Sequence, residues 1–130
     1  MAKITGLGGV FIKSQDKTAL MEWYRKSLGL PLEDYGGTGF DWRNAEDQEK
    51  TGYTLFSLFD KDTTYFEPSK APFMINFRVD DLDAILAELK ERGVTVIDQK
   101  EEGDFGRFGW ILDPEGNRIE LWEPPEGQRG

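Results

Sequence analysis

A single carboxylate, Glu120, lies in the part of this sequence best suited to carry chemistry. It stands between Ile119 and Leu121 in a run typical of a β-strand, and side chains alternate along a strand, so it faces away from both apolar neighbours. On the inner side of a curved sheet such a group can accept a proton or orient a ligand. On a solvated sheet it would instead pair with a cation, and Arg78, Arg118 or Lys13 would then be its partner. The sequence around Glu120 leaves both interpretations open.

The residues on either side of Glu120 predict a β-hairpin over residues 106–124. Pro114 favours a turn because its ring fixes φ, and Gly116 and Asn117 tolerate a positive φ. Phe108, Trp110 and Ile111 precede the turn, and these types are common in strands. We therefore expect Glu120 on the second strand of this hairpin, on one face with Arg118 and Trp122.

The residue types that are missing exclude several classes of site. Among the 130 residues there is no histidine and no cysteine. Without them there can be no Ser-His-Asp triad, no thiolate nucleophile and no ordinary zinc site. The net charge of −9 argues against nucleic acid or an anionic membrane as a partner, because both require a basic surface. No apolar run is long enough to cross a membrane and no signal peptide is evident, so a cytoplasmic location is expected.

A strand followed by a helix occurs twice. Residues 4–14 and 73–79 have strand character, and the helical spacing of apolar residues predicts helices over 17–27 and 82–92. Asp16 and Asp81, 65 positions apart, are the expected N-caps, with Asp80 as an alternative for the second helix. Further strands are expected over 39–43, 53–59 and 94–98, with a linker over 60–72 and an acidic loop over 101–104.

One face of the predicted strands mixes aromatic and polar side chains, as the wall of a ligand pocket does. A solvated sheet face would have the same composition, but its aromatic side chains would then form an exposed apolar patch. We therefore favour a cup that holds a ligand. The expected ligand-binding residues are Phe11, Phe59, Met74, Asn76, Arg78, Trp110, Glu120 and Trp122.

Two segments, VFIKSQDKTALMEWYRKSLGL near the start and DPEGNRIELWEP near the end, make the sequence resemble the vicinal oxygen chelate superfamily of glyoxalases, bleomycin resistance proteins and extradiol dioxygenases. The resemblance covers about residues 4–124. It implies an α+β fold in which two βαβββ modules have mixed sheets curled into a cup, the glyoxalase/bleomycin resistance-like fold. It also implies one domain over 1–130, with modules at about 4–66 and 73–124, and a homodimer.

Metal-dependent members of that superfamily place one ligand on each of four strands. Carried over position by position, these ligands correspond to Gly9, Ser57, Met74 and Glu120. Only Glu120 has a side chain of the family type, and one carboxylate with one hydroxyl is too few for a catalytic divalent ion. We therefore expect no metal and no cofactor.

These observations favour a metal-free protein that sequesters a small organic ligand, cationic or aromatic, as bleomycin resistance proteins do. The alternative is a glyoxalase-like lyase or isomerase, or a dioxygenase, with an atypical active site around Glu120, which is the only candidate for a catalytic residue. A third possibility is an interaction module without a ligand. Whether the protein turns over a substrate is not written in the sequence, and its missing metal ligands weigh against an enzyme.

Overall fold

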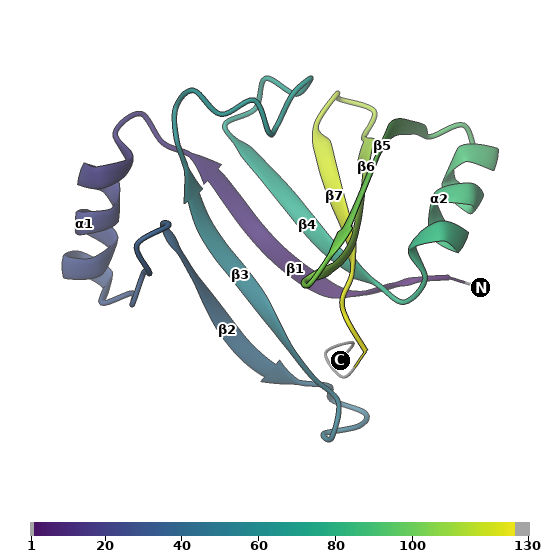
Figure 1. Cartoon of the computed structure of the whole chain (residues 1–130), viewed down its shortest axis with the longest axis horizontal. Coiled ribbons are helices and arrows are strands. Elements are labelled where there is room, and N and C mark those ends of the chain that lie inside the picture. Colours follow the sequence, from purple (N-terminus) through teal and green to yellow (C-terminus); the bar gives the residue numbers. More distant parts are fainter. Residues whose placement is uncertain (1, 127–130) are drawn as a thin grey trace.

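A computed structural model describes residues 2–126 and shows one curled sheet with a helix at each end (Figure 1). The sheet has seven strands in the order β2-β3-β1-β4-β7-β6-β5. The elements in chain order are β1 (Ile4–Lys13), α1 (Lys17–Leu28), β2 (Gly37–Arg43), β3 (Thr51–Phe59), β4 (Phe73–Val79), α2 (Leu82–Glu91), β5 (Thr95–Gly103), β6 (Gly106–Leu112) and β7 (Arg118–Glu123). This mixed α+β arrangement confirms the predicted fold class.

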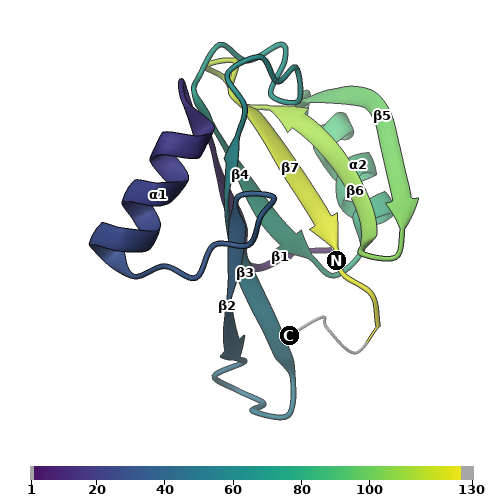
Figure 2. The ribbon, with the colours of Figure 1, turned by 60° about the vertical axis from the view of Figure 1, so that its left-hand side comes forward.

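The two halves of the chain meet at the centre of the sheet. β1 is antiparallel to its neighbour β4 and parallel to its other neighbour β3. β4 is parallel to β7. The sheet curls away from the plane of its central strands at β5 and β6, which stand at the right of Figure 2. Neither helix in the described part of the chain is long and apolar enough to cross a membrane.

Both helices begin where the sequence predicts. The carboxylates of Asp16 and Asp81 accept hydrogen bonds from the backbone N–H of Ala19 and Ala84, each at 3.1 Å. These bonds satisfy N–H groups that have no partner inside the helix. Gly29 ends α1 in the left-handed conformation, with φ of 69°.

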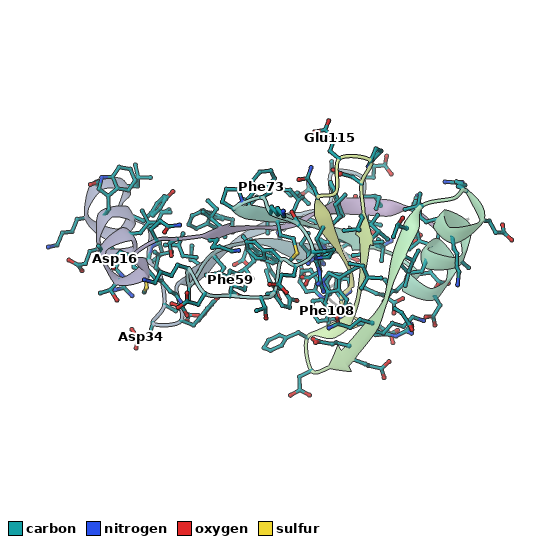
Figure 3. The ribbon with its side chains drawn as sticks, turned by 90° about the horizontal axis from the view of Figure 1, so that it is seen from above. Asp16, Asp34, Phe59, Phe73, Phe108 and Glu115 are labelled. Carbon is teal, nitrogen blue, oxygen red and sulfur yellow. The ribbon has the colours of Figure 1, made fainter. Side chains whose placement is uncertain are left out.

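Each helix covers one end of the same sheet face. Met21 of α1 packs with Leu58 and Ile12, and Leu82 and Ile85 of α2 pack with strand residues of the second half. The opposite face carries a third apolar cluster, of Phe11, Phe66, Met74 and Trp110. In Figure 3, Phe59 and Phe108 lie on one side of the ribbon and Phe73 on the other.

Two segments differ from the sequence prediction. The acidic residues Glu101 and Glu102 belong to β5, which was expected to end at 98, because they pair with Phe108 and Arg107 of β6. Charged side chains on both faces of an exposed strand leave no alternation to detect. Residues 30–36 form no strand, so the first half has two strands after its helix where three were expected. In that segment Pro31 has no N–H to offer, and Gly36 takes a positive φ of 106°.

Candidate functional site

Glu120 lies near the middle of β7 on the concave face, with only 2% of its surface exposed. The β6–β7 hairpin holds it there, because Trp110 on β6 is its direct cross-strand neighbour. Asn76 on β4 is its neighbour on the other side. The expected cationic partners Arg78, Arg118 and Lys13 make no ion pair with it among the described residues.

Three neutral donors hold the carboxylate. The amide Nδ2 of Asn76 donates to Oε1 at 2.5 Å, and the indole N–H of Trp110 donates to Oε2 at 3.0 Å. The phenol of Tyr65, from the loop between β3 and β4, also donates to Oε2. A buried carboxylate without such partners would be very costly, so this cage lets the group remain at the wall of the cup.

Burial raises the pKa of Glu120 above the ordinary value of a glutamate. The three hydrogen bonds and the charge of Arg118 oppose that shift without cancelling it. Burial also raises the pKa of the Tyr65 phenol, and the nearby carboxylate raises it further, so Tyr65 stays protonated as a donor. A carboxyl group with a raised pKa is better suited to accept and return a proton near neutral pH.

A mainly apolar cleft of about 490 Å³ opens beside Glu120. This volume is ordinary for a small-molecule site. Residues of β1, β3, β4, β6 and β7 form its walls, and exposed residues of the connection between α1 and β2 form part of its mouth. It is lined by Gly8, Phe11, Glu33, Tyr35, Tyr53, Leu55, Asn76, Phe105, Phe108, Glu120 and Trp122.

Half of the expected ligand-binding residues line this cleft: Phe11, Asn76, Glu120 and Trp122. The other four lie elsewhere. Met74 and Trp110 are buried in the cluster behind the wall, and Phe59 stacks on Tyr65 with ring centroids 5.7 Å apart. Arg78 is fully buried, with its guanidinium 4.8 Å from the ring centre of Trp122.

Sequence reasoning missed several functional candidates. Tyr65 lies in the segment expected to be only a linker. The one available hint of a buried loop was that two aromatic residues, Tyr65 and Phe66, follow each other in this segment. Glu33 and Tyr35 follow a helix and precede a strand, a position typical of solvated turns. Only the folded chain brings these residues to Glu120 or to its cleft.

The residues present do not fit the metal centre of the resembled superfamily. The strand register aligns Leu55, Gly9, Asn76 and Glu120 in one row across the sheet. Ser57 and Met74, expected in this row, belong to the neighbouring row through Phe11. The row supplies one carboxylate and one amide, fewer donors than a catalytic divalent ion needs. Within residues 2–126, no three His, Cys, Asp or Glu side chains come together as a metal site.

Arg118 stabilises the loop that carries Tyr65. Its guanidinium donates to the backbone oxygen of Glu67 at 2.5 Å and lies 4.9 Å from the ring centre of Trp110. It also lies 5.7 Å from the ring centre of Tyr65. Arg118 therefore fixes two of the three donors to Glu120 without contacting the cleft itself.

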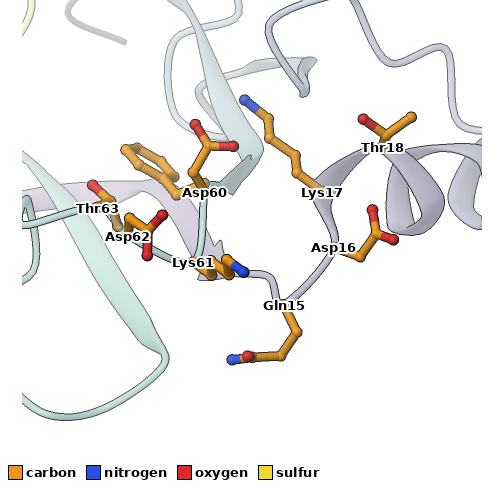
Figure 4. A pocket seen from close by; sticks show the side chains of 9 residues that line it. Gln15, Asp16, Lys17, Thr18, Asp60, Lys61, Asp62 and Thr63 are labelled. Atoms are coloured by element: carbon orange, nitrogen blue, oxygen red, sulfur yellow. The ribbon is translucent and has the colours of Figure 1, made fainter.

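A second hollow, of about 670 Å³, lies between the start of α1 and the loop after β3 (Figure 4). Figure 4 shows Lys17 and Asp60 reaching into the space between these segments. Its wall carries charged side chains of both signs, and the carboxylate of Asp16 is already the N-cap of α1. Phe59 is the one aromatic residue in its lining, and its acids are exposed, so the first cleft is the better candidate.

Comparisons with known proteins agree with this fold. A family model described as a glyoxalase-like domain matches residues 9–122. The chain is similar to the crystal structure of methylmalonyl-CoA epimerase from Mycobacterium tuberculosis, with 27% identity, a TM-score of 0.60, and 93% of this chain and 89% of that chain covered. No curated protein matches the chain.

Two further structures show the fold alone. One is a Streptomyces coelicolor methylmalonyl-CoA epimerase variant in complex with 2-nitronate-propionyl-CoA. It has 23% identity and a TM-score of 0.66, and the match covers 95% of this chain and 99% of that chain. The other is described as an NAD-dependent benzaldehyde dehydrogenase from Legionella pneumophila. It has 16% identity and a TM-score of 0.58, and the match covers 89% of this chain and 97% of that chain.

The expectation of a sequestering protein of the bleomycin resistance type is wrong. The Mycobacterium tuberculosis relative is an epimerase, which is a kind of isomerase, and it favours the lyase or isomerase alternative. The expectation failed because it inferred from the missing metal ligands that the protein has no catalytic activity. The buried acid and its three donors form an arrangement that does not depend on a metal ligand.

Proposed function

This chain belongs to the glyoxalase-like domain family, and from that membership we propose that it is an enzyme of the lyase or isomerase type that moves a proton on a small organic substrate. The observation that carries the proposal is the position of Glu120, buried at the wall of an apolar cleft. Similarity to an epimerase supports the same class of reaction. We propose a single vicinal-oxygen-chelate-like domain over residues 1–130, with modules at about 4–66 and 73–124.

Glu120 is the proposed base. Its carboxylate would remove a proton from a carbon next to a carbonyl group and return that proton to a carbon atom of the product. The raised pKa of Glu120 brings it closer to the range where proton transfer in both directions is fast. Tyr65 and Trp110 hold the carboxylate at Oε2, which leaves Oε1 and Asn76 as the polar groups nearest the substrate.

The cleft supports a substrate with an aromatic or cationic part. Phe11, Phe108 and Trp122 offer ring faces, and the two charged side chains of the lining, Glu33 and Glu120, are acids. The poor fit of the donor row to a divalent ion supports a metal-free reaction. The proton transfer then depends on the chain's own groups.

Two further parts of the proposal concern assembly and location. Exposed aromatic side chains such as Trp23, Phe40 and Phe73 are available for an interface, which supports a homodimer. Light scattering on the purified protein tests it, and a mass of one chain would contradict it. A sequence without cysteine is compatible with a cytoplasmic protein.

Exchange of substrate hydrogen for deuterium tests the proposed reaction directly. The protein is incubated in D₂O with methylmalonyl-CoA, acetophenone and 2-hydroxyacetophenone, and the protons beside each carbonyl are followed by proton NMR. We expect catalysed exchange for at least one compound, and its loss in Glu120→Gln, which keeps the size of the side chain. Exchange at the same rate in Glu120→Gln would assign the base elsewhere, and no exchange above buffer would contradict the proposed reaction.

A further inference from the structure

The outer edge of β2 has no strand beside it. β2 begins the strand order of the sheet and pairs only with β3, which lies on its inner side in Figure 1. In the second half of the chain, β6 holds the matching position, and there β5 pairs with its outer side. The first half has no strand like β5, because residues 30–36 form none. The repeat therefore leaves one strand position open, next to β2.

The hydrogen bonds of β2 show which of its backbone groups point outward. The N–H of Leu58 donates to the carbonyl oxygen of Gly36 at 3.0 Å, so residues 36, 38, 40 and 42 face β3. The residues between them point their backbone groups the other way. Gly37 agrees with this alternation, because its outward oxygen accepts a hydrogen bond at 2.9 Å from the connection that precedes β2. The outward N–H and C=O groups of Gly39 and Asp41 have no backbone partner within residues 2–126.

The other open edge of the sheet is protected in a way that β2 is not. β5 carries four charged side chains, and its register with β6 shifts between Val96 and Lys100. Charges and irregularities of this kind keep an edge strand from pairing with another molecule. The middle of β2 carries Phe40 instead, with 48% of its surface exposed, and its register with β3 is unbroken. Asp41 and Arg43 are its two charged residues, so β2 has no net charge.

From these observations we propose that β2 pairs antiparallel with β2 of a second copy of this chain, which joins the two sheets edge to edge. The inference rests on the homodimer of the proposed function and specifies its interface. An antiparallel strand suits the open position, because β5 is antiparallel to β6 at the matching place. A two-fold axis between the copies lets both strands use the same residues.

The sequence of β2 selects one register for this pairing. With Phe40 on the two-fold axis, Gly39 lies opposite Asp41 of the partner subunit, and the two exchange their outward backbone hydrogen bonds. The two Phe40 side chains then contact each other across the axis. With Asp41 on the axis, two carboxylates would face each other. With Gly39 on the axis, Asp41 would meet Gly37, whose outward oxygen is already bonded. β2 is therefore complementary to itself in the register centred on Phe40.

A single cysteine tests this register, because the chain has no other. Residues that face each other in a non-hydrogen-bonded pair have Cα atoms about 4.5 Å apart, which a disulfide can span. We expect oxidised Phe40→Cys to run mainly as a covalent dimer on a non-reducing gel. Phe73→Cys, at a side chain 41% exposed on β4, is the control and should run mainly as one chain. A Phe40→Cys protein that cross-links no more than Phe73→Cys would overturn the proposal.

Two substitutions at Gly39 test the backbone hydrogen bonds. Gly39→Pro removes an N–H that points outward, so the pairing of β2 with β3 should survive. Gly39→Ala keeps that N–H and is the matched control, since its added Cβ would lie 3.5 Å from the ring of Tyr53, an ordinary contact. Circular dichroism checks that both variants are folded. By light scattering we expect Gly39→Pro to have the mass of one chain at concentrations where the wild type and Gly39→Ala have the mass of two.

The outcomes separate this interface from the rest of the proposed function. A folded Gly39→Pro protein with the mass of two chains would place the dimer interface elsewhere and contradict this inference alone. A wild type with the mass of one chain at every concentration would contradict both this inference and the homodimer. Deuterium exchange depends on Glu120 and not on β2, so a failure of the proposed reaction is detected independently of either result.

Discussion

Tyr65 donates a hydrogen bond from its phenol to Oε2 of Glu120, although 55 positions in the chain separate them. This bond lowers the pKa of Glu120, while burial raises it. The loop between β3 and β4 therefore sets the proton affinity of the proposed base. Tyr65 does not line the cleft, so it acts as a positioning residue.

Tyr65→Phe removes that donor while keeping the ring. Without it the pKa of Glu120 should rise, so the acid limb of the pH profile for deuterium exchange should move to higher pH. Below the new midpoint we expect a loss of about 10- to 100-fold, the worth of one hydrogen bond to a charged group. Tyr24→Phe, in α1, is the matched control. A rate reduced equally at every pH, with an unmoved midpoint, would show that Tyr65 has only a structural role.

The raised pKa of Glu120 also predicts how stability changes with pH. A glutamate whose pKa is higher in the folded than in the unfolded state binds its proton more tightly when folded. Its stabilising contribution is complete below the ordinary value of 4.5 and is lost as pH rises through the folded value. Each unit between the two values is worth about 1.4 kcal/mol.

Urea unfolding of the wild type and Glu120→Gln between pH 4 and pH 8 measures this contribution. Other carboxyl groups such as Asp83, whose pKa hydrogen bonds lower, titrate in both proteins and cancel in the difference. We expect the free energy of unfolding of the wild type to fall relative to Glu120→Gln as pH rises from about 4.5. A difference that is constant, or that grows with pH, would contradict the direction of the shift.

Gly8→Ala tests how tightly the wall around Asn76 is packed. The added methyl would overlap Asn76 Oδ1, and the hydrogen bond to Glu120 keeps that side chain from turning away freely. We expect a loss of about 1–3 kcal/mol in the free energy of unfolding, the usual cost of overpacking. Gly103→Ala is the control, because nothing lies within 4 Å of its added Cβ. Equal effects of the two substitutions would show that the space at Gly8 is not needed.

The sequence predicted the helices and strands around this site better than the side chains that contact Glu120. Asp16 and Asp81 predicted where both helices begin, because an N-cap depends only on residues close by in the sequence. The alternation around Glu120 predicted its face, because a hairpin turn and period-two spacing are also local. Tyr65 could not be predicted, since its hydrogen bond depends on how a loop without periodicity folds over the sheet.

The error in the four-strand row has a similar cause. Met74 and Asn76 point to the same face of β4, so alternation alone cannot tell which of them stands beside Glu120. The parallel pairing with β7 decides it, and that pairing joins Asn76 to Glu120. Carrying the family's ligand positions over to this sequence assigns Met74 to the ligand position of β4. In the structure Met74 is instead buried with Phe11 and Trp110.

Glu33 at the mouth of the cleft should control which charges enter. Glu33→Lys replaces the carboxylate by an ammonium group, so binding of methylmalonyl-CoA should tighten several-fold at low salt. The gain should disappear at high salt, because Glu33 is exposed and its charge is screened. Glu46→Lys, in the loop between β2 and β3, changes the net charge equally away from the cleft. Calorimetric titrations that show the same gain for both variants would assign the effect to overall charge, and no gain for Glu33→Lys would show that the mouth does not select against anions.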